Sequence, residues 1–143
     1  MIKTQDISLL IAFFGFNNSI VEGRTRIQKD ICILKYRDQL PFNFEFESYF
    51  YGPYSEELAD TIDTLVTSGI LEQRTVRFPN GERRYDYKLT DEGNSMFKII
   101  RSRLRNNQEL MSTLKNRIRQ LKKLSIPETV SAAKKCSGMQ STK

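Results

Sequence analysis

The sequence predicts an α+β fold, and three observations carry this prediction. Residues 4–16, 24–39 and 56–68 place apolar side chains at steps of three and four, as amphipathic helices do. Residues 42–51 instead alternate apolar and polar side chains, which is typical of a strand with one buried face. Asn80-Gly81 lies between two short strand-like segments, where it favours a tight hairpin turn. With 143 residues, 38% of them apolar, the chain suits one domain with an appendage.

Two helices are expected in the first forty residues. The first covers residues 4–16, and residues 15–23 after it predict a loop. The second runs from residue 24 to about 39, because Pro41 cannot continue a helix. The second helix should direct three apolar residues inward: Ile27, Ile31 and Leu34. It should direct three cationic residues outward: Arg24, Lys29 and Arg37.

An aromatic strand and a third helix follow. The buried face of the strand is expected to consist of Phe42, Phe44, Phe46 and Phe50. Gly52-Pro53 turns the chain, Ser55 is placed to cap a helix, and Gly69 suits its end. This third helix carries four acidic side chains and no Lys or Arg: Glu56, Glu57, Asp60 and Asp63.

The hairpin strands are expected at residues 70–78 and 84–89. Four guanidinium groups lie on the two strands and close to the turn: Arg74, Arg77, Arg83 and Arg84. Thr90 and the acidic pair Asp91-Glu92 then open a final helix, because carboxylates suit the positive end of a helix dipole.

Residues 94–124 are expected to form one long basic helix of roughly 45 Å, with an apolar seam at steps of three and four. The seam is interrupted by Asn107 and consists of Phe97, Ile100, Leu104, Met111, Leu114, Ile118 and Leu121. A partner subunit or another protein would then bury it. The alternative is a break near Asn106-Asn107, with both halves packed on the same domain.

The residues beside the seam are basic, which predicts an acidic covering surface. Residues 41–70 hold six acidic residues and no Lys or Arg. We therefore expect the long helix to pack near the third helix of its own or a partner subunit. This would place Arg101, Arg103 or Lys115 close to Glu56, Glu57 or Asp60.

The stretch LVTSGILEQRTVRFPNGERRYDYKLTDEG, residues 65–93, resembles the third helix, wing and following helix of MarR- and PadR-type regulators. These belong to the winged helix-turn-helix superfamily. RIQK at 26–29 and YGPYS at 51–55 are similar to YwgA-type and Panacea-type antitoxin domains. The resemblance implies a winged-helix domain at residues 1–93, with an extra aromatic strand. The long basic helix at 94–124 would serve dimerisation or partner packing, and 125–143 would form a short capped helix and a frayed tail.

In winged helices that read DNA, the resemblance implies that the wing touches phosphate. One hypothesis is therefore a regulator held to the backbone of double-stranded DNA by its wing and basic C-terminal helix. The candidate contacts are Arg74, Arg77, Arg83, Arg84, Arg24, Arg26, Lys29, Arg101, Arg103 and Arg105.

An acidic third helix is repelled by phosphate, however. The alternative is an antitoxin-like or accessory winged-helix protein that binds another protein, acidic or toxin-like, through the third helix and the aromatic strand. The third-helix surface is expected to include Ser55, Glu57, Asp60, Thr61 and Thr64.

Composition excludes several other classes. The chain has no histidine, no spacing that assembles a nucleophile with a base, and no phosphate-cradling glycine loop, so no enzyme, metal site or cofactor is predicted. No apolar run approaches the roughly 18 residues of a membrane span, and Met1-Ile2-Lys3 does not open a signal peptide. Cys32 within an apolar run predicts a buried thiol in a reducing compartment and no disulfide. A cytoplasmic homodimer is expected.

Overall fold

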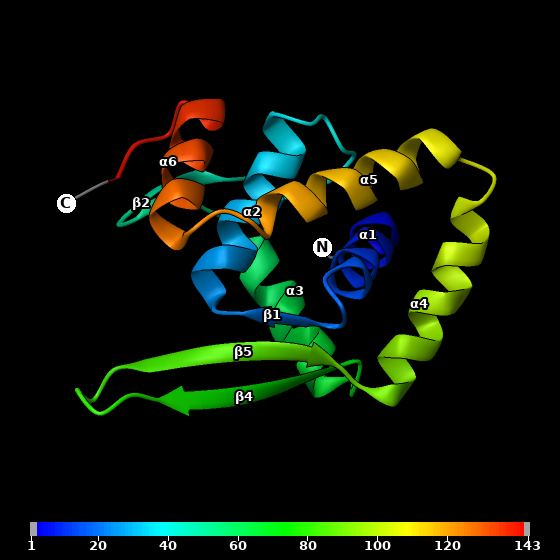
Figure 1. Ribbon diagram of the computed structural model, residues 1–143, viewed down its shortest axis with the longest axis horizontal. Helices are drawn as coiled ribbons and strands as arrows, with labels where there is room; N and C mark the ends of the chain where they lie inside the picture. Colours follow the sequence, from blue (N-terminus) through cyan, green and yellow to red (C-terminus); the bar gives the residue numbers. More distant parts are fainter. Residues whose placement is uncertain (1–2, 142–143) are drawn as a thin grey trace.

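The computed structural model describes residues 3–141, which form six helices and two small antiparallel sheets (Figure 1). The predicted α+β class is confirmed. The helices are α1 (Thr4–Phe16), α2 (Arg24–Tyr36), α3 (Glu56–Thr67), α4 (Asp91–Leu104), α5 (Gln108–Leu121) and α6 (Ile126–Ser137). The strands are β1 (Ile20–Glu22), β2 (Glu47–Tyr49), β3 (Gly52–Tyr54), β4 (Leu71–Arg77) and β5 (Arg83–Leu89).

The larger sheet has the order β1-β5-β4. Strand β5 lies in the middle and pairs antiparallel with both neighbours, from Leu71 opposite Leu89 to Arg77 opposite Arg83 on the β4 side. Strand β1 lies in the segment that was predicted to be a loop, so that prediction is wrong there. Asn18 and Ser19 adopt positive φ angles of 59° and 73°, which turn the chain after α1 and bring β1 alongside β5.

The aromatic segment is only partly the strand that its alternation predicts. Phe42, Phe44 and Phe46 are buried as expected, but strand pairing begins at residue 47. Upstream of residue 47, side chains satisfy the backbone: the amide of Asn43 donates to Asp6, 2.8 Å, and the carbonyl of Phe44 accepts from Lys35. The prediction that Phe50 is buried is wrong: it lies in the turn between β2 and β3.

Helix α1 occupies the centre of the structure, with α4 and α5 folded around it (Figure 1). Six consecutive residues of α1, from Leu9 to Phe14, are buried, so the helix is covered on all sides. The ring of Phe97 on α4 meets the ring of Phe16 edge to face, with centroids 5.2 Å apart. The C-terminal helices therefore complete the core.

The prediction of one long C-terminal helix is wrong, and the alternative of a break near Asn106-Asn107 is what the structure contains. Helix α4 ends at Leu104, and the side chain of Asn107 caps α5 by accepting a hydrogen bond from the amide of Leu110, 3.1 Å. This cap lets both halves of the seam pack on the chain's own core. The later seam residues are buried: Leu114, Ile118 and Leu121. The earlier ones are half-buried: Phe97, Ile100, Leu104 and Met111.

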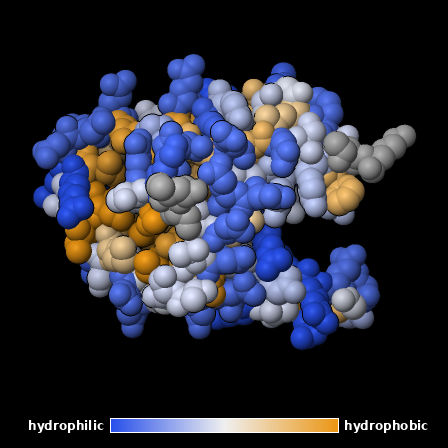
Figure 2. Space-filling model, turned by 180° about the vertical axis from the view of Figure 1, so that it is seen from behind, coloured by the Kyte–Doolittle hydropathy of each residue, from blue (hydrophilic) through white to orange (hydrophobic). Residues whose placement is uncertain are grey.

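The expected proximity of the basic seam edge to α3 is wrong within one chain, and proximity to α3 of a partner subunit stays a prediction. Helices α4 and α5 pack on α1 and α2. Arg101 lies over the ring of Phe16, and Arg117 pairs with Asp38, 3.5 Å apart. Among residues 3–141, none of the expected cations forms a salt bridge with the carboxylates of α3. Figure 2 shows apolar side chains gathered on the side of the molecule where α4 lies.

The short C-terminal helix is confirmed as α6. The Ser125 side chain accepts from the Glu128 amide, and the Glu128 side chain accepts from the Ser125 amide, so the predicted capping box is present. Helix α6 packs beside α2 (Figure 1).

Burial of the seam within one chain has a measurable consequence. Leu114→Ala removes a fully buried side chain and should lower the free energy of unfolding by about 2–5 kcal/mol in a chemical denaturation experiment. Ile99→Ala on the exposed side of α4, where Ile99 is 54% exposed, is the control and should change it by less than about 0.5 kcal/mol. A loss of less than about 0.5 kcal/mol for Leu114→Ala would contradict this account, because this side chain would then not be buried in the core of the chain.

Candidate functional site

The four arginines of the β4–β5 hairpin, called the wing below, lie in different environments. Arg84 is neutralised within the sheet: its Nε lies 2.8 Å from Asp86, and its Nη2 bonds Glu22. The bond to Asp86 raises the pKa of Arg84 above its ordinary value. Arg74, Arg77 and Arg83 are exposed and form no salt bridge with any residue that the structure describes. Three of the four predicted wing cations are therefore available to a ligand.

The cations at the start of α2 are mostly committed to the fold. Lys29 is buried and donates to the carbonyl of Pro53 on β3, 2.8 Å, so its predicted outward orientation is wrong. Arg26 donates to the carbonyls of Leu121 and Leu124, 3.2 and 2.6 Å, where α5 ends. These bonds satisfy carbonyls that a helix end leaves without an intrahelical partner, so Arg26 acts as a structural cap.

The remaining candidate cations lie at the opposite end of the molecule. Arg101, Arg103 and Arg105 are exposed at the end of α4, far from the turn of the wing (Figure 1). The exposed cations are thus divided between two distant surfaces. The structure does not bring the predicted contacts together into one basic face.

The surface of α3 is acidic, as predicted, but two of its expected members are internal. Ser55 is fully buried and caps the helix by accepting from the amide of Leu58, 3.1 Å. Thr61 is buried and donates to the carbonyl of Glu57. Their expected place on the surface is therefore wrong, whereas Glu57, Asp60 and Thr64 are exposed. The hydroxyl of Thr64 donates to the carbonyl of Asp60, 3.0 Å, so its proton is also used within α3.

Acidic side chains gather where α3 begins and the aromatic segment passes beside it. Four glutamates and Phe46 line a hollow of about 300 Å³ there. The carboxylate of Glu57 accepts a hydrogen bond from the backbone amide of Glu45, 3.1 Å, which joins the two segments. The glutamates are Glu45, Glu47, Glu56 and Glu57.

Exposed aromatic rings continue this surface along the β2–β3 hairpin. Tyr49, Phe50 and Tyr51 are 43%, 56% and 71% exposed. Tyr49 stacks on Tyr54 with centroids 4.9 Å apart, so its ring is held in place although it faces solvent. Glu47 lies two residues before Tyr49 on β2 and therefore on the same face. We call the following residues the acidic–aromatic surface: Glu45, Glu47, Glu56, Glu57, Tyr49, Phe50 and Tyr51.

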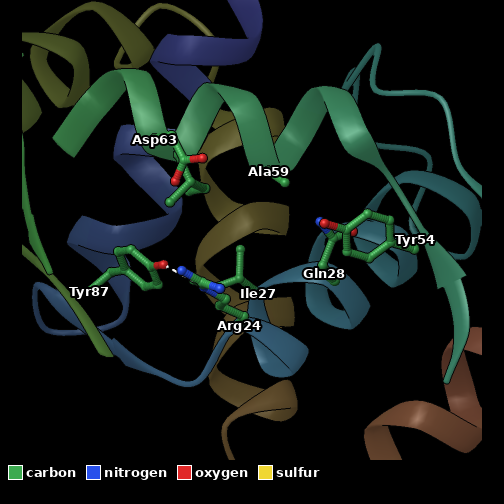
Figure 3. Close-up of a pocket in the computed structure, with 8 residues that line it drawn as sticks. Arg24, Ile27, Gln28, Tyr54, Ala59, Asp63 and Tyr87 are labelled. Carbon is green, nitrogen blue, oxygen red and sulfur yellow. Dashed lines mark hydrogen bonds between the residues drawn. The ribbon is translucent and has the colours of Figure 1, made fainter. Parts of the chain in front are cut away.

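A pocket of about 140 Å³ lies between α2, α3 and the wing (Figure 3). The Nε of Arg24 donates to the hydroxyl of Tyr87, 2.9 Å, and the side chain of Gln28 bonds both the amide and the carbonyl of Ser55. These hydrogen bonds join α2 to the wing and to the start of α3, so the pocket lies at a junction of structural elements. It is lined by Arg24, Ile27, Gln28, Tyr54, Ala59, Ile62, Asp63 and Tyr87.

Next to Lys29, α2 carries a second buried charge. Asp30 is 1% exposed, and its Oδ1 has no hydrogen-bond partner among residues 3–141. The nearest cation is Arg26, 3.9 Å away. Burial raises the pKa of Asp30 to about 7 and lowers the pKa of Lys29 to about 8. Sequence periodicity could not identify this pair, because both residues occupy positions that are normally exposed on an amphipathic helix.

The chain matches no family model. It is similar to the uncharacterized protein YwgA of Bacillus subtilis (strain 168), with 37% identity over 86 residues. The match covers 60% of this chain and 50% of YwgA, so the chain spans about half the length of that relative. The resemblance to YwgA that the sequence suggested is confirmed by this similarity. Each helix within residues 3–141 is too short or too polar to span a lipid bilayer.

The buried carboxyl predicts a specific pH dependence. Because the pKa of Asp30 rises from 3.8 in the unfolded chain to about 7 in the fold, the folded state binds this proton more tightly. Its contribution to stability is therefore present at low pH and is lost as the pH rises through about 7, at up to about 1.4 kcal/mol per pH unit. Asp30→Asn should flatten this loss in denaturation curves between pH 4 and 7.

Asp60→Asn is the matched control, because Asp60 is an exposed carboxylate on α3. Its curve should follow the parent protein. If Asp30→Asn also followed the parent protein across this range, Asp30 would not be the group responsible.

Proposed function

We propose that this protein is a winged-helix module that binds another protein, and that it docks a Lys- and Arg-rich segment of that partner on the acidic–aromatic surface. The observation that carries the proposal is a cluster of four glutamates at the start of α3, with three exposed aromatic rings on the adjoining β2–β3 hairpin. An antitoxin-like or accessory subunit is the kind of protein that such a surface suits.

The order of elements supports the winged-helix part of the proposal. Helix α1, strand β1, helices α2 and α3 and the β4–β5 hairpin follow one another, and β1 pairs with the second strand of the hairpin. The insertion of β2 and β3 between α2 and α3 distinguishes this chain from a plain helix-turn-helix, in which a short turn joins these helices. The insertion also supplies the exposed aromatic rings.

Electrostatics favour a protein partner over DNA at α3. The exposed face of α3 carries only acidic charges, and phosphates brought close to it would be repelled. A guanidinium or ammonium group of a partner would instead pair with these carboxylates. Exposed Tyr and Phe rings add cation–π contacts and buried aromatic area, which are the usual anchors of a protein interface.

Phosphate binding by the wing is a second candidate, favoured by one observation. Arg77 and Arg83 face each other directly across the strands, and neither forms a salt bridge within residues 3–141. Like charges in this register repel each other, so an anion bound between them would be stabilising. Figure 2 shows that a notch separates the wing from the body of the molecule, which leaves the wing free to contact a nucleic acid.

The expected homodimer also stays a prediction. The half-buried apolar side chains of α4, with the exposed Ile99, are the surface available for it.

The docking proposal is tested by neutralising the exposed glutamates Glu47 and Glu56. Glu47→Gln with Glu56→Gln should weaken binding of a fluorescein-labelled Lys- and Arg-rich peptide about tenfold in a fluorescence anisotropy titration, because two direct charge pairs are lost. Glu72→Gln with Glu82→Gln on the wing removes the same charge from other exposed positions and should have little effect.

Labelled random duplex DNA is titrated in parallel at low and moderate salt. Equal weakening by both glutamate pairs would show that only net charge matters. Tight binding of the duplex together with no binding of the peptide would overturn the docking proposal in favour of the wing.

A further inference from the structure

The two cysteines of the chain, far apart in sequence, meet between α2 and α6. Cys32 on α2 is fully buried, and Cys136 near the end of α6 is half-buried. Helix α6 packs along α2, and this packing places the two side chains close enough to interact. The sequence predicted a buried thiol without a disulfide, because the separation of the two residues hides their proximity.

Helices α2 and α6 run side by side in the same direction, because Lys29 and Lys134, farther along the two helices, both reach β3. Near the start of both helices, Nη1 of Arg26 lies 3.5 Å from the hydroxyl of Thr129. Cys32 follows Arg26 by six residues, and Cys136 follows Thr129 by seven. These intervals correspond to roughly 9 and 10 Å of helix, so the two cysteines are at matching heights. The sulfur pair is thus positioned by two packed helices and not by a mobile loop.

The environment gives the two thiols different properties. The hydrogen bond with Cys136 and the burial of its side chain raise the pKa of Cys32, so it stays a thiol. The hydrogen bond from Cys32 lowers the pKa of Cys136 to about 7, and the nearby Arg37 acts in the same direction. The lowered pKa increases the thiolate fraction of Cys136 at neutral pH, and the thiolate is the form that reacts with oxidants.

We propose that Cys136 and Cys32 form a peroxide-responsive dithiol site, which closes to an intramolecular disulfide between α6 and α2. In the first step the Cys136 thiolate attacks a hydroperoxide: an S–O bond forms, the O–O bond breaks, and the leaving oxygen takes a proton from solvent. In the second step the sulfur of Cys32 attacks the resulting sulfenic acid. The S–S bond forms, the S–O bond breaks, and the departing hydroxide takes the Cys32 proton as water.

Two thiols are oxidised by two electrons, and one hydrogen peroxide is reduced to two water molecules. A half-buried attacking cysteine on α6, packed against a helix that carries a buried cysteine, is the arrangement of a reactive cysteine beside a resolving cysteine.

A disulfide between Cys32 and Cys136 would link α6 to α2 beneath the β2–β3 hairpin, which carries part of the acidic–aromatic surface. The side chain of Lys134 on α6 lies against Gly52 of β3, and Lys29 of α2 bonds the next residue, Pro53. The β2–β3 hairpin is therefore backed by both helices that the disulfide would join. The dithiol site itself does not depend on the docking function.

The test treats the reduced full chain with a small excess of hydrogen peroxide at neutral pH. We expect a monomer that has lost the mass of two hydrogen atoms under denaturing conditions, a cross-linked Cys32–Cys136 peptide after digestion, and full reversal by dithiothreitol. The oxidised form should also unfold at a higher temperature than the reduced form.

Two single variants distinguish the roles of the two cysteines. Cys136→Ser should form no disulfide, whereas Cys32→Ala should accumulate a sulfenic acid at Cys136 that dimedone traps. Two free thiols after treatment, a dimer linked through Cys136, or over-oxidation of Cys136 while Cys32 stays free would each overturn the proposal.

Discussion

The rest of the structure depends on the covering of α1. Residues Leu9 to Phe14 are buried in succession, so this helix needs apolar partners on every side. Helices α4 and α5 supply them by folding back over α1, and the cap at Asn107 makes that reversal possible. Because most of the seam is buried within the chain, a partner can contact the acidic start of α3, the β2–β3 hairpin, the wing and the outer side of α4.

Much of this fold follows from the sequence. Periodicity located α1, α2 and α3, and the capping residues Ser55 and Ser125 marked two helix starts correctly. The failures have physical causes. Strand β1 has only three residues, too few for a period, and its pairing with β5 is a long-range contact. The spacing of the apolar seam is the same whether the seam packs on a partner or on α1. The spacing alone therefore does not show that the helix breaks at Asn107, which depends on tertiary packing.

The candidate site was harder to predict than the fold. The four arginines are equivalent in the sequence, but Arg84 is neutralised by Asp86 and Arg26 caps α5, whereas Arg77 and Arg83 form no salt bridge within residues 3–141. Such differences come from contacts between distant segments, which no local pattern records. The acidic character of α3 and the aromatic strand were visible in the sequence, whereas the exposure of Phe50 required the turn that β2 and β3 form. The proximity of Cys32 to Cys136 likewise needed the packing of α6 on α2.

We propose that a basic partner docks on the acidic–aromatic surface. A titration of the ¹⁵N-labelled protein with a Lys- and Arg-rich peptide, followed by amide chemical shifts, tests this claim most directly. The account predicts that the largest shifts fall in residues 45–51 and at the start of α3, around Glu56 and Glu57, while the amides near Arg77 and Arg83 stay unchanged. Shifts concentrated at the wing turn or at the end of α4, with none along the β2–β3 hairpin, would contradict it.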